Sequence, residues 1–225
     1  MAKYSSLVAK IRVWTPFFAR ISYRHDFMLV IQALSKRRRF HLPSEIWSIV
    51  EPTGGFLSVK EARLLYWAAS EWPVSGPVLE LGSFEGRSTL LFALSGRTVH
   101  AVDAWSTETL GDKESAEAVF RHFKENIQRA DVEALVSIHR GLTHEVGKNW
   151  TVPGAILFVD AGHEYEDVRD DLNIWTPHLL PDGLLLMHDV LGGRRVSVVR
   201  AASEVLRQDW RVVASAGGIV AFTRK

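Results

Sequence analysis

Short apolar runs alternate with segments of helical periodicity along most of this 225-residue chain, and this alternation constrains the fold more than any other feature. The runs at 78–81, 98–102, 135–139, 155–159 and 184–187 predict strands, and those at 212–214 and 219–223 predict a terminal hairpin around Gly217-Gly218. Helices are predicted over 58–72, 87–94, 114–129, 143–147, 165–179 and 196–206, the first with a Ser58-x-x-Glu61 capping box. Repeated β-α units imply an α/β fold with a mainly parallel sheet and helices on both faces.

The chain divides by charge into two unlike segments. Residues 1–42 hold nine Lys or Arg and one acid, a charge of +8, whereas residues 43–225 hold 18 bases and 25 acids, a charge of −7. We therefore expect a basic helical extension over 1–42 and an α/β domain over 43–225. The chain has no Cys, which excludes a thiolate metal site and a Cys nucleophile.

The basic extension predicts two helices that meet at Pro16. Apolar residues recur every three or four positions over 7–21, and the second helix would run to about Leu34, before the basic run at 36–39. Three interpretations stay open: a lid on the domain, the arm of a homodimer, or a patch in peripheral contact with an anionic membrane. No apolar stretch is long enough to span a bilayer and no signal peptide is evident. We expect a cytoplasmic protein, either free or peripheral at the membrane, with no nucleic-acid partner.

Ligands of such sheets bind beyond the carboxyl ends of the strands, so the residues that follow each strand form the candidate site. After the first strand, Gly82 allows a tight turn, and Gly86 opens a helix whose free N–H groups can bind polar ligand atoms. The loop is neither G-x-G-x-x-G nor a P-loop, and Glu85 would repel a pyrophosphate. A ligand with an amino acid and a sulfonium therefore fits better than a dinucleotide. Asp103, after the second strand, is placed to accept hydrogen bonds from ribose hydroxyls.

Two pairs of an acid and a histidine follow the fourth and fifth strands. Asp160 and His163 come after the fourth, and His188 and Asp189 after the fifth. Because these strand ends meet at one rim, the four side chains predict a shared site. Asp160, His188 and Asp189 offer two carboxylates and an imidazole to a divalent cation. The imidazole of His163 is suited to take a proton from a hydroxyl near neutral pH.

In this order and spacing the motifs resemble those of class I S-adenosylmethionine-dependent methyltransferases. The similar branch is bacterial, has an Asp-Gly-x-His-x-Tyr type loop after the fourth strand, and is related to macrolide sugar and catechol-type O-methyltransferases. The resemblance covers about residues 75–225 and is carried by 78–88, 102–105, 158–165 and 187–189. It implies a Rossmann-like seven-stranded sheet whose last strand is antiparallel.

The resemblance implies methyl transfer to the oxygen of a sugar or other small hydroxylated acceptor, with His163 as general base. The implied cofactors are S-adenosylmethionine and Mg²⁺ or another divalent cation, the latter on Asp160, His188 and Asp189. His188 stands where the metal-binding relatives usually have a carboxylate. The residues assigned to S-adenosylmethionine lie at four strand ends: Glu80, Gly82, Ser83, Phe84, Glu85, Gly86, Ser88, Asp103, Ala104, Trp105, Thr143 and Asp160.

Two other functions stay open. One is the cephalosporin-hydroxylase-like branch, which shares the fold and the acidic motifs. The other is a membrane- or partner-docking protein with a vestigial cofactor pocket, which the +8 extension favours. The acceptor pocket is expected from residues 1–42, the loop 105–113 and the loop after Asp189 with Gly192-Gly193-Arg194-Arg195.

Overall fold

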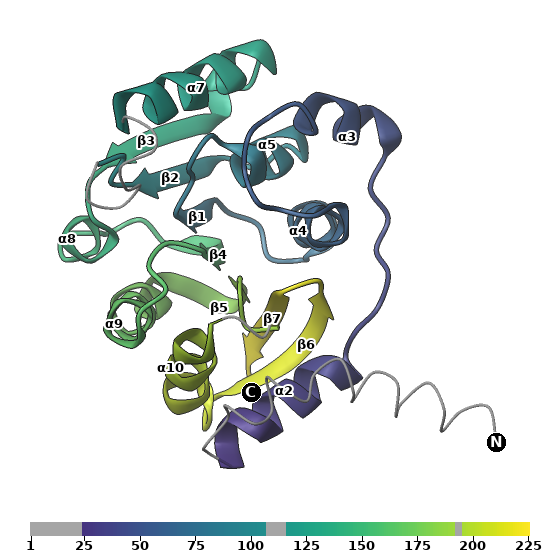
Figure 1. The fold of residues 1–225 in the computed structure, drawn as a ribbon, viewed down its shortest axis with the longest axis vertical. Helices are drawn as coiled ribbons and strands as arrows, with labels where there is room; N and C mark the ends of the chain where they lie inside the picture. Colours follow the sequence, from purple (N-terminus) through teal and green to yellow (C-terminus); the bar gives the residue numbers. More distant parts are fainter. Residues whose placement is uncertain (1–23, 107–115, 192–194) are drawn as a thin grey trace.

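A seven-stranded sheet forms the centre of the computed structural model, which describes residues 24–106, 116–191 and 195–225 (Figure 1). The strand order is β3-β2-β1-β4-β5-β7-β6. Strands β1 to β5 are parallel, and β7 is antiparallel to both of its neighbours. The predicted seven-stranded α/β sheet with a terminal antiparallel hairpin is therefore confirmed. The strands are β1 (Val78–Leu81), β2 (Val99–Asp103), β3 (Val136–Arg140), β4 (Gly154–Val159), β5 (Leu179–Met187), β6 (Trp210–Ala216) and β7 (Ile219–Arg224).

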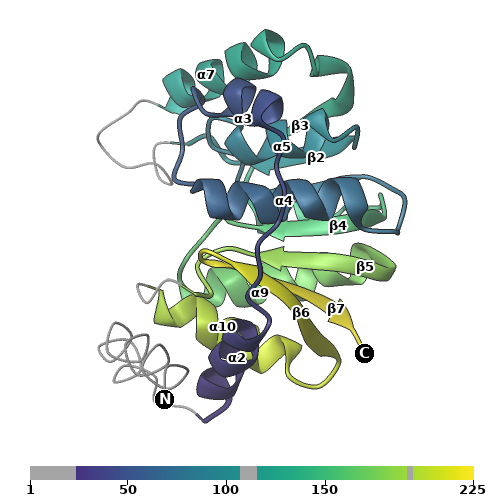
Figure 2. The same ribbon diagram turned by 90° about the vertical axis from the view of Figure 1, so that its right-hand side faces the viewer.

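Helices cover both faces of the sheet (Figure 2). Successive strand residues point to opposite faces, so Val78 of β1 joins one apolar cluster while Leu79 and Leu81 join the other. Burial on both faces explains why the central strands are continuous apolar runs. The first cluster includes α3 (Ser44–Val50), α4 (Val59–Glu71), α5 (Arg87–Leu94) and α7 (Ala116–Arg129); the second includes α2 (Arg24–Ser35), α8 (Thr143–Gly147), α9 (Tyr165–Trp175) and α10 (Val196–Leu206).

The boundary between α9 and β5 differs from the sequence prediction. The helix expected over 165–179 ends at Trp175, and a 3₁₀ turn, Thr176–His178, follows it. Pro177 lies in this turn, where its ring and missing N–H prevent a further helical turn. Strand β5 accordingly starts at Leu179, which pairs with Gly154, rather than at Leu184. Helix α3 was not predicted.

The described part of the basic extension packs on the domain. Helix α2 contributes Leu29, Val30 and Ala33 to the same apolar cluster as α10 and β7. The basic run after it, expected only to end the helix, forms a parallel bridge to β6, in which the amides of Arg38 and Ser215 take part. Residues 7–21 and the helix start at Pro16 lie outside the described residues, and the domain boundary at 42 stays a prediction. Among the described helices, none is long and apolar enough to cross a membrane.

Two arginines fasten the segments that lead into the sheet. The Arg87 guanidinium donates to the backbone carbonyls of Glu51, Thr53, Gly55 and Leu57, and so ties the segment before α4 to the start of α5. Arg97 binds four carbonyls between Ala69 and Gly76 in the same way, at the end of α4 and before β1. Each side chain satisfies carbonyls that have no helical or strand partner.

Candidate active site

The loop after β1 is held against the ends of β2 and β4. The backbone N–H groups of Ser83 and Phe84 donate to Asp103 Oδ2, each at 2.9 Å, and the N–H of Trp105 donates to Asp103 Oδ1 at 2.8 Å. Gly82 has a φ of +88°, and a Cβ at this position would lie 2.2 Å from the backbone oxygen of Asp160. Only glycine fits there, since the chain needs both the left-handed conformation and the close approach of two loops.

The Trp105 side chain holds the loop after β1 in place. Its side chain is fully buried, and its Nε1 donates to the carbonyl oxygen of Phe84 at 2.8 Å. Phe84 and Trp105 both have positive φ angles, 49° and 40°. Non-glycine residues adopt this conformation rarely, and it persists where surrounding contacts hold it. The two aromatic residues therefore shape the loop, and Asp103 joins them to β2.

Glu80 is a buried acid at the base of the loop. Its Oε2 accepts hydrogen bonds from the hydroxyls of Ser83 and Thr89, whereas its buried Oε1 has no hydrogen-bond partner among the described residues. Burial raises the pKa of Glu80 to about 7, although hydrogen bonds from the neighbouring hydroxyls oppose the shift. The side chain thus keeps one acceptor atom available.

The ends of β4 and β5 bring the two predicted acid–histidine pairs together. His163 Nε2 lies 3.0 Å from Asp189 Oδ2, and His188 Nδ1 lies 3.3 Å from Asp160 Oδ1 and 3.5 Å from Asp189 Oδ1. The hydroxyl of Ser197 in α10 donates to the backbone oxygen of His163 at 2.6 Å. An imidazole whose Nε2–H faces Asp189 presents the Nδ1 lone pair for a proton, and the carboxylate orients the ring.

Glu61 of α4 completes this cluster from outside the strand ends. Its Oε2 accepts from the N–H of Ser58, and the Ser58 side chain accepts from the backbone N–H of Glu61, which together form the predicted capping box. Oε2 also accepts from the Ser58 hydroxyl, and Oε1 accepts from the N–H of Gly218 at 2.6 Å. The same Oε1 lies 3.6 Å from His188 Nε2. The sequence showed Glu61 only as a helix cap, because nothing local to residues 58–61 indicates that the β6–β7 turn and the end of β5 lie beside it.

Charge in the cluster is unevenly distributed. Burial alone would lower the pKa of His188, but Asp189, Glu61 and Asp160 raise it to about 11. Burial likewise opposes ionisation of Glu61, yet the close contact with His188 and hydrogen bonds from Ser58 and Gly218 lower its pKa to about 2. His163 and His188 hold the pKa of Asp189 well below its usual range. Burial raises the pKa of Asp160 to about 7 against the pull of His188.

The remaining predicted residues divide into two groups. Ser88 is buried in the first turn of α5, and Ala104 lies between Asp103 and Trp105 at the loop. Glu85 and Thr143 have side-chain partners of their own: Glu85 Oε1 lies 3.0 Å from His122 Nδ1 in α7, and the Thr143 hydroxyl donates to Asp171 in α9. Most of the expected acceptor loops, 107–113 and 192–194, lie outside the described residues.

The loop after β1 fits the cofactor that the sequence suggests. Gly82 allows the close approach of the two loops, the N-terminus of α5 after Gly86 has no side-chain cap, and Glu80 Oε1 has no partner among the described residues. Asp103 follows β2 beside it, as a ribose-binding acid would. The donor set for a divalent cation fits poorly, because both ring nitrogens of His188 face carboxylates.

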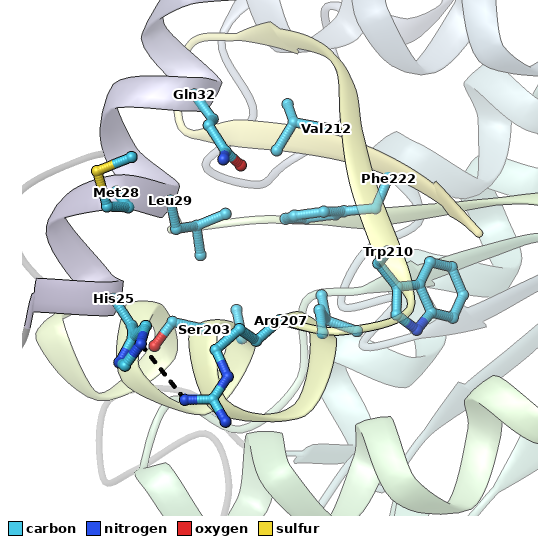
Figure 3. A pocket seen from close by; sticks show the side chains of 11 residues that line it. His25, Met28, Leu29, Gln32, Ser203, Arg207, Trp210, Val212 and Phe222 are labelled. Carbon is cyan, nitrogen blue, oxygen red and sulfur yellow. Dashed lines mark hydrogen bonds between the residues drawn. The ribbon is translucent and has the colours of Figure 1, made fainter. Parts of the chain in front are cut away.

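A separate pocket of about 90 Å³ lies on the α2 side of the sheet (Figure 3). Leu29 and Gln32 of α2 face Phe222 and Val212 of the terminal hairpin, and His25 contacts Arg207 at 3.4 Å. None of its lining residues belongs to the strand-end cluster. We assign it no part in the site.

Comparison with known proteins agrees with this geometry. Residues 79–190 match the family model for a methyltransferase domain. A putative O-methyltransferase from Klebsiella pneumoniae has 14% identity and a TM-score of 0.61, over 82% of this chain and 91% of its own. The O-methyltransferase TomG from Streptomyces achromogenes, solved with S-adenosylmethionine, has 16% identity and a TM-score of 0.61, over 87% and 96%.

A third structure is CalS11, described as a TDP-rhamnose 3′-O-methyltransferase of calicheamicin biosynthesis. It has 16% identity and a TM-score of 0.55, over 88% of this chain and 92% of its own. The strand order, the loop after β1 and the family match over residues 79–190 together identify a methyltransferase domain with the class I fold.

Proposed function

We propose that the chain methylates an oxygen of a small hydroxylated acceptor, with a sugar as the favoured class, and that His163 is the general base. The observation that carries this proposal is the pairing of His163 with Asp189 at the same rim as the loop after β1. The O-methyltransferases among the similar structures, one of them acting on a nucleotide sugar, support the oxygen acceptor.

The residues would divide the work as follows. Gly82 and the N-terminus of α5 would hold the methionine part of S-adenosylmethionine, and Asp103 its ribose. The bound cofactor supplies an electrophilic methyl group on a sulfonium. The acceptor hydroxyl would give its proton to Nδ1 of His163 while Asp189 keeps the ring in place. Positioning and base catalysis are thus the contributions of the protein.

Cofactor binding is the first test. Isothermal titration of the full chain with S-adenosylmethionine should give one saturable site, and Asp103→Ala should weaken it. No binding at millimolar cofactor would refute the proposal and favour the docking protein with a vestigial pocket. Release of S-adenosylhomocysteine in the presence of nucleotide sugars and phenols then identifies the acceptor class. Hydroxylation of an acceptor without methyl transfer would favour the cephalosporin-hydroxylase-like branch.

His163→Ala tests the base. We expect cofactor affinity to stay unchanged and turnover to fall by about 10²–10⁴-fold, the usual contribution of a general base. The matched control is His25→Ala, which removes an exposed histidine in α2 away from the strand ends. Unchanged turnover in His163→Ala would exclude this residue as the base.

For the basic extension we propose a cap that packs on the domain. The packing of α2 and the bridge between the run after it and β6 support this role. Flotation of the full chain with anionic liposomes, compared with a chain that lacks residues 1–23, tests the membrane alternative. Sedimentation of the same two proteins tests the homodimer.

A further inference from the structure

His188 lies among three carboxylates from three different elements. Glu61 of α4 faces Nε2, and Asp160 and Asp189 face Nδ1, at 3.3–3.6 Å. Only 13% of the His188 side chain is exposed, and neither nitrogen forms a hydrogen bond of good geometry. These contacts are ion pairs when the ring is protonated. A side chain this buried among acids is stabilised as a cation, since a neutral ring would leave the three carboxylates uncompensated.

The same arrangement disfavours a metal ligand at position 188. A histidine ligates a cation through a nitrogen lone pair, so it must be unprotonated at that atom. Both nitrogens of His188 instead face acids, and magnesium prefers oxygen ligands in any case. Asp160, His163 and Asp189 do have ligand atoms within 4.8 Å of one another. A cation there would break the contact between His163 and Asp189 and would lie against the positive ring of His188.

We propose that the His188 side chain supplies, with its own charge, the positive centre that metal-binding relatives obtain from a divalent cation. The catalytic role of this charge rests on the proposed methyl transfer. The arrangement of charges itself does not, because it is a property of the folded chain. Glu61 anchors the ring from the side opposite the strand ends. His188 in turn compensates Asp160 and holds Asp189 where it can orient His163. It is a positioning residue, and the site needs no divalent cation.

Metal binding tests this without knowledge of the acceptor. The full-length protein is titrated with Mn²⁺ by electron paramagnetic resonance, with and without S-adenosylhomocysteine. We expect no site in the wild type tighter than about 1 mM, the weak end of protein sites for divalent ions. His188→Glu supplies the carboxylate that the relatives have, and we expect it to gain one Mn²⁺ site and to melt at a higher temperature with Mn²⁺ than without it.

His25→Glu is the matched control, since it adds an acid to exposed α2, and it should gain no site. One tight Mn²⁺ site in the wild type that Asp160→Asn removes would overturn the inference. So would a folded His188→Glu that binds no Mn²⁺. If that variant does not fold even with Mn²⁺ present, His188→Asp replaces it with the same expected gain. Failure to bind S-adenosylhomocysteine would count against the proposed function alone, because Mn²⁺ binding is measured separately.

Discussion

Glu80 should make the protein less stable as the pH rises, and Glu80→Gln should remove this effect. The pKa of Glu80 is raised from 4.5 to about 7 in the folded chain. An acid with a raised folded-state pKa stabilises the fold below its unfolded pKa, and this contribution is lost as the pH rises through the folded pKa. The loss therefore falls between about pH 4.5 and pH 7.

The size of the effect follows from the shift. One unit of pKa difference corresponds to about 1.4 kcal/mol, so the full shift is worth about 3 kcal/mol, most of which falls between pH 5 and pH 8. A glutamine resembles the protonated acid in shape and can keep the bonds to Ser83 and Thr89. It has no charge to desolvate.

Urea unfolding at pH 5 and pH 8 measures the prediction. From the lower to the higher pH, the free energy of unfolding of Glu80→Gln should rise by about 2 to 3 kcal/mol relative to the wild type. The comparison with the wild type cancels other titrating groups, such as Asp160 and Asp171. Glu133→Gln, an exposed substitution, should stay within about 0.5 kcal/mol of the wild type. A difference for Glu80→Gln that is the same at both pH values would refute the reasoning.

The other predictions concern the loop and the arginine contacts. Gly82→Ala should abolish titratable binding of S-adenosylmethionine, because its Cβ would lie 2.2 Å from the Asp160 carbonyl oxygen. Wild-type affinity would show that the loops after β1 and β4 need not approach so closely. Arg97→Ala should lower the free energy of unfolding by about 3 kcal/mol, since it leaves carbonyls between Ala69 and Gly76 without donors. Arg121→Ala, which removes a surface ion pair with Glu125, is its control and should cost less than about 1 kcal/mol.

Much of the fold could be predicted because its signals are local. Helices α5, α8 and α10 and strand β1 have the expected bounds, and the capping box of Ser58 and Glu61 starts α4 as expected. The end of α9 was predicted four residues too late, because the apolar pattern over 165–179 was followed past Pro177, whose missing N–H ends the helix. The continuous apolar runs, which reflect burial on both faces, predicted the strands of the sheet. The sequence offers no comparable pattern for the short helix α3.

Only the part of the candidate site that follows from the sheet topology could be predicted from the sequence. Parallel strands put Asp103, Asp160 and Asp189 at one rim, and the structure places them there. The backbone donors that occupy Asp103, and the third acid beside His188, depend on contacts between residues far apart along the chain. No spacing rule encodes those contacts.

Glu61, the carboxylate at the start of α4, also accepts a hydrogen bond from Gly218 in the turn between β6 and β7. Glu61 and Gly218 are 157 positions apart, so helix α4 is synthesised long before Gly218 is available to bind Glu61. Contacts of such separation form late, once most of the chain entropy has been spent. A chain that loses its terminal hairpin would thus keep the five parallel strands and the loop after β1, yet lose an anchor of its acid–histidine cluster. The acid–histidine cluster is therefore complete only after the β6–β7 hairpin has been made and has packed on the sheet.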